Sequence, residues 1–219
     1  MRSPVVVALA TALGLSLTPA VPALAAADRT SALRLLNSLP VANERPAGYV
    51  RDLFADWLDR DGNGCDTRQD VLIAERLAGR VAGCVVTGGR WISSYDGVVT
   101  KSPTRFDIDH RVPLEEAWAS GAWRWTHSTR DRYSNDLGYS QSLVAVSASS
   151  NRSKGDREPG EWMPPLRTQR CAYVKQWIAV KFRWRLAVDA REKSTLTRYL
   201  SGCDPLMSVP PRAVVHARA

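Results

Sequence analysis

Two short segments, well separated along the chain, carry residue types that can do chemistry together. In the first, Asp107-Ile108-Asp109-His110, β-strand alternation points Asp107 and Asp109 to the same side, and His110 follows at the strand end before Pro113. A carboxylate is a hard oxygen ligand suited to Mg²⁺ or Mn²⁺. An imidazole has a pKa near neutrality and can take a proton from water. These groups are therefore suited to acting on a phosphodiester bond with one metal ion.

The second segment combines a short apolar strand with a helical turn. The run from Leu143 to Val146 predicts the strand, and residues 149–154 predict the turn. Asn151 and Lys154 are three residues apart, so they share one face of the turn. Asn151 can offer a neutral oxygen to a metal ion, and Lys154 can place a positive charge beside a phosphate.

Taken together, the two segments resemble the HNH, or ββα-metal, nuclease family. A closer resemblance is to secreted bacterial HNH endonuclease-family proteins, whose domain is related to the C-terminal domain of GmrSD-type restriction endonucleases. The resemblance covers most of the chain after residue 25 and is most specific in residues 107–165. The segments that carry it are Asp107 to Leu114, Ala117 to Ala122, Ser134 to Leu137, Leu143 to Asp156 and Glu161 to Pro165.

The resemblance implies a metal-dependent endonuclease that hydrolyses DNA, and it leaves RNA open as a substrate. His110 would be the general base, and Asp109 and Asn151 would hold one Mg²⁺ or Mn²⁺ ion. Lys154 would contact the phosphate. Further nucleic-acid contacts are expected from Arg111, Arg152 and Arg157.

One position departs from the family pattern. Many HNH modules carry a middle Asn just before the second strand, and here that position is Ser142. Asn135 is the candidate to replace it by holding the loop that orients His110, but Ser134-Asn135-Asp136 would equally suit a helix end. Asp107 and Ser142 are also candidates for side chains that support the metal ligands from behind. Asp107 could instead be a charged residue at the strand end without a role in the site.

The elements that must position these residues predict an α+β fold. A ββα-metal core would be surrounded by flanking helices and stabilised by disulfides. The apolar periodicity predicts helices at residues 29–39, 47–58, 68–77, 115–119, 128–136, 168–188 and 190–201. Short strands are expected at residues 84–87, 90–93, 98–100, 106–109 and 143–146.

Four segments are expected along the chain. Residues 1–25 read as a signal peptide, with an apolar run followed by Ala23-Leu24-Ala25. Residues 26–100 would form a helical segment and a strand meander, residues 101–204 the nuclease core with its C-terminal helices, and residues 205–219 a disordered basic tail. We therefore expect a secreted protein without a membrane segment in its mature form.

The charge of the chain favours a polyanionic partner. Lys and Arg number 30 against 22 Asp and Glu, which gives a net charge of +8. Nucleic acid, anionic lipid and cell-wall polymer all satisfy this charge. The sequence points to no protein partner.

An even number of cysteines in an exported chain predicts disulfides. Cys65, Cys84, Cys171 and Cys203 allow three connectivities. The pairing Cys65–Cys84 with Cys171–Cys203 is favoured because each bridge closes a short local loop.

A second metal is conceivable in an acidic loop. Asp59, Asp61 and Asn63, followed by Gly64, have the opening spacing of a calcium-binding loop, and Asp70 stands at its twelfth position. The alternative is an acidic turn pinned by Cys65. Two other functions stay open: a degenerate HNH module that binds nucleic acid or cell-wall anions without cutting, and a calcium-dependent surface protein built around residues 59–70.

Overall fold

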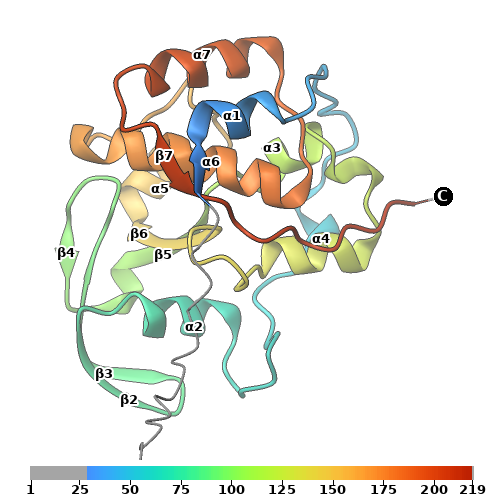
Figure 1. The fold of residues 1–219 in the computed structure, drawn as a ribbon. Coiled ribbons are helices and arrows are strands. Elements are labelled where there is room, and N and C mark those ends of the chain that lie inside the picture. Colours follow the sequence, from blue (N-terminus) through green and yellow to red (C-terminus); the bar gives the residue numbers. More distant parts are fainter. Residues whose placement is uncertain (1–28, 219) are drawn as a thin grey trace, which may run out of the picture.

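The computed structural model of the protein describes residues 29–218, and these form a mixed α/β fold (Figure 1). The helices are α1 (Ala32–Asn37), α2 (Thr67–Ala74), α3 (Leu114–Ala119), α4 (His127–Ser134), α5 (Ala148–Lys154), α6 (Arg170–Trp184) and α7 (Ala190–Leu200). The 3-10 helices are η1 (Arg51–Leu53), η2 (Pro103–Arg105), η3 (Ala122–Arg124) and η4 (Arg167–Gln169). The strands are β1 (Arg29–Ser31), β2 (Ala78–Ala82), β3 (Val85–Ile92), β4 (Val99–Thr100), β5 (Phe106–His110), β6 (Leu143–Ser147) and β7 (Leu206–Ser208).

Within the described residues the strands form three small antiparallel sheets, ordered β1-β7, β2-β3-β4 and β5-β6. Helices α1, α6 and α7 gather at one end of the molecule, and α2 with the β2–β3 hairpin lies at the other (Figure 1). The β5-β6 pair and α5 lie between these two ends (Figure 1). The two chemistry-bearing segments of the sequence therefore meet in the middle of the fold.

The β5-β6 pair is packed between two hydrophobic cores. Val144 and Val146 face the core built around α6, whereas Leu143 and Ala145 face a second core that contains Trp91. Because both faces are covered, β6 reads in the sequence as a continuous apolar run rather than as an alternating one.

Helix α5 follows β6 without a connecting loop. Ser147 ends the strand and caps the helix, since its Oγ accepts a hydrogen bond from the backbone N–H of Ser150 at 3.2 Å. Gly155 adopts a φ of 53°, a backbone conformation that terminates the helix at low cost for glycine. This places α5 directly against β5.

Helix α6 is the centre of the main core. Val174, Trp177 and Ile178 are fully buried there. Lys181, also on α6, donates hydrogen bonds to Glu116 of α3 and Glu192 of α7, each at 2.6 Å. This buried ion network links three helices of the core.

The two disulfides are Cys65–Cys84 and Cys171–Cys203, with Cα–Cα distances of 5.4 and 5.6 Å. The favoured local pairing is therefore confirmed. The first bridge joins the acidic loop before α2 to the β2–β3 hairpin, and the second joins the start of α6 to the segment after α7.

The N-terminal predictions were partly wrong. Residues 29–31 form β1 instead of starting a helix, and residues 47–58 contain only η1. The backbone around Trp57 is held instead by Asn135, which bonds to Leu58 N and Asp56 O. Tertiary hydrogen bonds thus override the helical pattern of this segment.

The strand meander also differs from its prediction. Strand β2 was missed, and the two strands predicted at residues 84–87 and 90–93 are one strand, β3, that spans Val85–Ile92 and runs through Gly88 and Gly89. A Cβ on Gly79 of β2 would lie 2.8 Å from the Cα of Gly89. The glycines therefore permit a close approach of two strands rather than forming a turn.

The prediction of a disordered tail was wrong. Strand β7 pairs with β1, and the backbone N–H of Ala213 donates to the oxygen of Arg183 at 3.0 Å. Met207 and Ala213 are buried. Proline content suggested disorder, but apolar residues spaced along the tail hold it on the helical core, where it runs along α4 (Figure 1).

The predicted signal peptide, residues 1–25, lies outside the described residues. Within residues 29–218, no helix has the length and apolar character that a membrane crossing requires.

Candidate active site

His110 lies at the end of β5 with its ring tightly held. Its Nε2 lies 2.9 Å from the main-chain oxygen of Ser134. Because a carbonyl oxygen only accepts hydrogen bonds, Nε2 carries the proton and Nδ1 keeps its lone pair. The ring is nearly parallel to those of Trp57 and Tyr133, with centroid distances of 5.4 and 6.2 Å. The orientation and the tautomer of His110 are thus both set by its neighbours.

Burial also controls the charge of His110. Loss of solvent lowers its pKa to about 4, against the opposing effects of the Ser134 hydrogen bond and the Asp109 carboxylate. The imidazole is therefore neutral at physiological pH, which is the form that can accept a proton.

The carboxylate of Asp109 is fixed by two donors. Its Oδ2 accepts a hydrogen bond from the Tyr95 hydroxyl, and its Oδ1 accepts one from Lys154 Nζ at 2.9 Å. Lys154 Nζ also donates to the main-chain oxygen of His110 at 2.9 Å. Asp109 is 6% exposed and Lys154 is fully buried, so this ion pair lies in the interior beside the pocket.

Asn151 faces the same strand from α5. Its Nδ2 donates to Asp107 Oδ2 at 3.1 Å, which turns the amide so that its NH₂ group points to Asp107. No group in residues 29–218 hydrogen-bonds to Asn151 Oδ1. The pair Asp107 and Asp109 on β5 thus faces the pair Asn151 and Lys154 on α5, as the periods of strand and helix require.

A pocket of about 220 Å³ brings these groups together. Asp109, Asn151 and His110 line the same space. Such a set can hold one hard divalent ion next to a neutral base. The complete lining is Arg51, Ile108, Asp109, His110, Pro113, Leu114, Asn151, Arg152, Gly155 and Asp156.

Two of the expected substrate contacts, Lys154 and Arg111, are buried. Lys154 is buried in the pair with Asp109, and Arg111 is 2% exposed with its guanidinium 5.1 Å from the Tyr95 ring centroid. Arg157 is exposed and lines a different, acidic pocket, and its contact with nucleic acid stays a prediction. Of the basic residues expected to contact nucleic acid, Arg152 is the one that is both exposed and part of the His110 pocket.

The two residues considered for the middle position of the motif do different things. Asn135 is 3% exposed, and its Oδ1 accepts from Leu58 N at 2.8 Å. Its neighbour Ser134 supplies the oxygen that bonds to His110. Ser142 is buried away from the pocket, and its Oγ donates to Asp136 Oδ2 at 2.7 Å.

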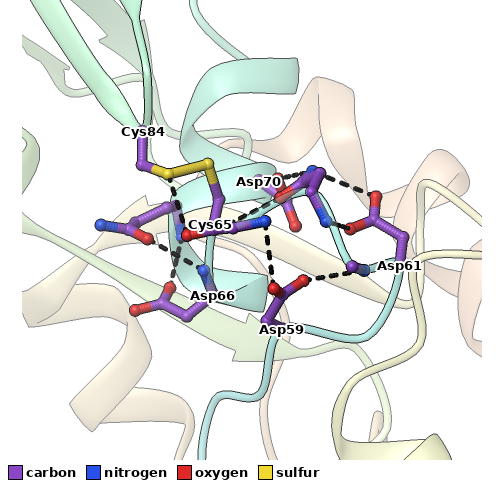
Figure 2. Close-up of a disulfide and its surroundings, with 10 residues drawn as sticks. Asp59, Asp61, Cys65, Asp66, Asp70 and Cys84 are labelled. Atoms are coloured by element: carbon purple, nitrogen blue, oxygen red, sulfur yellow. Dashed lines mark hydrogen bonds between the residues drawn. A yellow bond between two sulfur atoms is a disulfide. The ribbon is translucent and has the colours of Figure 1, made fainter.

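The acidic loop at residues 59–70 is closed by its own hydrogen bonds (Figure 2). Asn63 Nδ2 donates to Asp61 Oδ2 at 3.1 Å and to Asp70 Oδ1 at 3.0 Å. Asp59 accepts from the backbone N–H groups of Gly62 and Gly64. The loop carboxylates thus accept hydrogen bonds from groups of the same loop. Calcium binding here stays a prediction.

Three residues around the pocket were missed in the sequence. Arg51 lines the pocket, and Trp57 stacks on His110. The hydroxyl of Tyr95 donates a hydrogen bond to Asp109. Arg51 and Trp57 lay in a segment that reads as a helix, and Tyr95 lay in a turn without any motif. Their roles depend on long-range packing, so no local signal could identify them.

The chain matches the C-terminal domain of GmrSD restriction endonucleases over residues 80–199. It is also 43% identical, over 176 residues, to an uncharacterized secreted protein of Arthroderma benhamiae. The matched region covers 80% of this chain and 85% of that protein. No solved structure matches it. The disulfides and the secreted relative assign the protein to the extracellular space. The chain therefore belongs to the family of GmrSD restriction endonuclease C-terminal domains.

Proposed function

We propose that the protein is a secreted HNH-type endonuclease that hydrolyses phosphodiester bonds in DNA, with RNA as a second substrate to be tested. The observation that carries the proposal is the setting of His110. Its Nε2 is occupied by Ser134, its Nδ1 keeps a lone pair, and the ring lines one pocket with Asp109 and Asn151. Metal-assisted phosphodiester hydrolysis needs a neutral, oriented base beside oxygen ligands for the metal ion.

The local fold supports the same proposal. Strands β5 and β6 are antiparallel with His110 opposite Leu143, and α5 follows β6 directly. This order of strand, strand and helix agrees with a ββα-metal core. Its strand end supplies Asp109 and His110, and its helix supplies Asn151.

The residues present fit one divalent ion, Mg²⁺ or Mn²⁺. Asn151 Oδ1 is without a hydrogen-bond partner in the described chain, and Asp109 has a second lone pair on each oxygen. When bound, such an ion would neutralise charge on the scissile phosphate and stabilise the leaving oxygen. Asp107 supports this set by orienting the amide of Asn151.

The side chains of the protein would carry out the remaining steps. His110 Nδ1 would take a proton from the attacking water, while the Ser134 carbonyl stabilises the imidazolium through Nε2–H. Arg51 and Arg152, both exposed at the pocket, would bind the flanking phosphates. Asn135 would keep Trp57 in place against the His110 ring.

The test is cleavage of plasmid DNA, single-stranded DNA and RNA by the disulfide-bonded protein, with EDTA, Mg²⁺, Mn²⁺ or Ca²⁺. The proposal requires cleavage of DNA that depends on a divalent ion and is lost in Asn151→Ala. Asn37→Ala, at an exposed position at the end of α1, is the matched control and should cleave normally. Absence of cleavage with every ion, combined with retained DNA binding, would replace the proposal by a degenerate binding module.

A further inference from the structure

A second pocket, of about 320 Å³, has the opposite electrostatic character from the rest of the chain. It is lined by seven carboxylates and two arginines in a protein with a net charge of +8. The acidic residues are Glu44, Glu115, Glu116, Asp156, Glu158, Glu161 and Asp189. Of these, Asp156 alone also lines the His110 pocket. Such a surface repels phosphates, so the substrate of the proposed nuclease does not account for it.

Three of these carboxylates converge. One oxygen each from Glu44, Glu158 and Asp189 lies within 4.8 Å of the other two. Oxygen ligands of a calcium ion lie about 2.3–2.6 Å from it. Two ligands on opposite sides of the ion are therefore separated by about twice that length, which is close to the 4.8 Å limit that the three oxygens satisfy. The spacing therefore suits a single ion at the centre of the three groups.

Glu158 provides an independent sign of a missing partner. Glu158 is 8% exposed, and its Oε2 is buried with no hydrogen-bond partner among residues 29–218. The cation nearest to its other oxygen, Arg191 Nε, is 3.9 Å away on a side chain that is 65% exposed. A buried carboxylate oxygen left without a donor is costly, and a cation would compensate it.

The buried lysine of this region is already engaged. Lys181 is paired with Glu116 and Glu192. Asp189 uses Oδ1 to accept from the backbone N–H of Glu192 at 2.6 Å, as the N-cap of α7. Seven carboxylates against two exposed arginines thus leave the pocket with excess negative charge.

We propose that Glu44, Glu158 and Asp189 bind one calcium ion. Carboxylate oxygens with room for water are the ligands of Ca²⁺, which accepts variable geometry, whereas Mg²⁺ demands a near-ideal octahedron. The ion would tie together the loop after α1, the segment after α5 and the start of α7. Because α5 carries Asn151, the ion would also steady the helix that lines the neighbouring pocket. The proposal stands apart from the nuclease proposal, since it uses none of its residues.

The experiment is calorimetric titration of CaCl₂ into the disulfide-bonded protein without DNA, with thermal melts in Ca²⁺ and in EDTA. We expect a site with a Kd of about 10⁻⁴ to 10⁻³ M, typical of extracellular calcium sites, and a higher melting temperature with Ca²⁺. Glu158→Gln and Glu44→Gln should each weaken this binding by about tenfold or more. Glu44 is exposed, so its variant folds even if the buried change at Glu158 does not.

Three controls make the outcome specific. Glu161→Gln changes an acidic residue of the same pocket outside the converging trio, Asp61→Asn changes the loop at residues 59–70, and Asn151→Ala changes the His110 pocket. All three should retain the site. Absence of any calcium binding, wild-type binding by both Glu44→Gln and Glu158→Gln, or loss of all binding in Asp61→Asn would overturn the proposal.

Discussion

Lys154 Nζ lies 2.9 Å from Asp109 Oδ1, and the Lys154 side chain is fully buried. Burial lowers the pKa of Lys154, and the contact with Asp109 opposes this effect. The lysine thus holds the carboxylate of Asp109 from inside the protein, whereas the sequence suggested that it reaches outward to a phosphate. This pairing determines how the two residues respond to mutation.

Lys154→Met should destabilise the protein strongly, because it leaves the Asp109 carboxylate buried without its cation. Breaking one side of a buried ion pair costs roughly 3–5 kcal/mol in the free energy of unfolding. Urea denaturation at pH 7 measures this change. The double variant Lys154→Met with Asp109→Asn should recover much of the loss, and Lys101→Met, at an exposed position, should stay within about 0.5 kcal/mol of wild type. Equal stability of the two lysine variants would contradict the pairing.

Asn135→Ala should lower both stability and cleavage. The change leaves Leu58 N, at 2.8 Å from Asn135 Oδ1, and Asp56 O without their partner, at a cost of about 1–3 kcal/mol. Since Trp57 lies between these two residues, its stacking on His110 should loosen and the cleavage rate should fall at temperatures where the variant is fully folded. Rates and denaturation curves of Asn135→Ala and the exposed control Asn37→Ala provide the comparison. An unchanged rate would show that Asn135 has no part in positioning His110.

Arg51→Ala and Arg152→Ala should each weaken DNA binding and reduce its dependence on salt. Each removes one phosphate contact, so the slope of log K against log salt should decrease in magnitude by about 1. Fluorescence anisotropy with labelled duplex DNA at several salt concentrations measures the slope. Arg198→Ala, exposed on α7, is the matched control and should keep the wild-type slope. Slopes that are identical in all three variants would place the docking surface elsewhere.

Glu75→Gln should change how stability depends on pH. Burial raises the pKa of Glu75 from 4.5 to about 7, although its hydrogen bond from Ala145 N opposes this shift. The folded protein therefore keeps a proton that the unfolded chain has lost, and the stability that this group contributes is lost as pH rises from about 4.5 to 7.

Glutamine keeps an acceptor for Ala145 N but carries no charge. The melting temperature of Glu75→Gln should match wild type at pH 5 and exceed it at pH 8. Glu161→Gln, whose carboxylate is 43% exposed, should follow wild type at both values. The expectation fails if Glu75→Gln loses stability between pH 5 and pH 8 as steeply as wild type does.

The parts of the site that could be predicted are those encoded in short segments. Strand alternation brought Asp107 and Asp109 to one side, and helical spacing brought Asn151 and Lys154 to one face, as the structure has them. The pairing of Cys65 with Cys84 was also local. In each case the two residues are close in sequence, at most 19 residues apart for the disulfide, so the backbone period or the loop length constrains them.

What could not be predicted depends on tertiary burial. Arg111 and Lys154 have the residue types of phosphate contacts, yet both are enclosed by side chains from distant segments. Trp57 stacks on His110 while its neighbour Leu58 is held by Asn135, the residue that ends α4. No pattern in a single segment carries this information.

The most direct test of the proposed mechanism is the cleavage rate of His110→Ala with saturating Mg²⁺ or Mn²⁺, measured beside its DNA affinity and melting temperature. The exposed His216→Ala serves as the matched control. Loss of a general base should reduce the rate by about 10²–10⁴-fold, while DNA binding stays close to wild type at temperatures where the variant is fully folded. If His110→Ala cleaves DNA as fast as His216→Ala does, His110 is not the base and the account of this site is wrong.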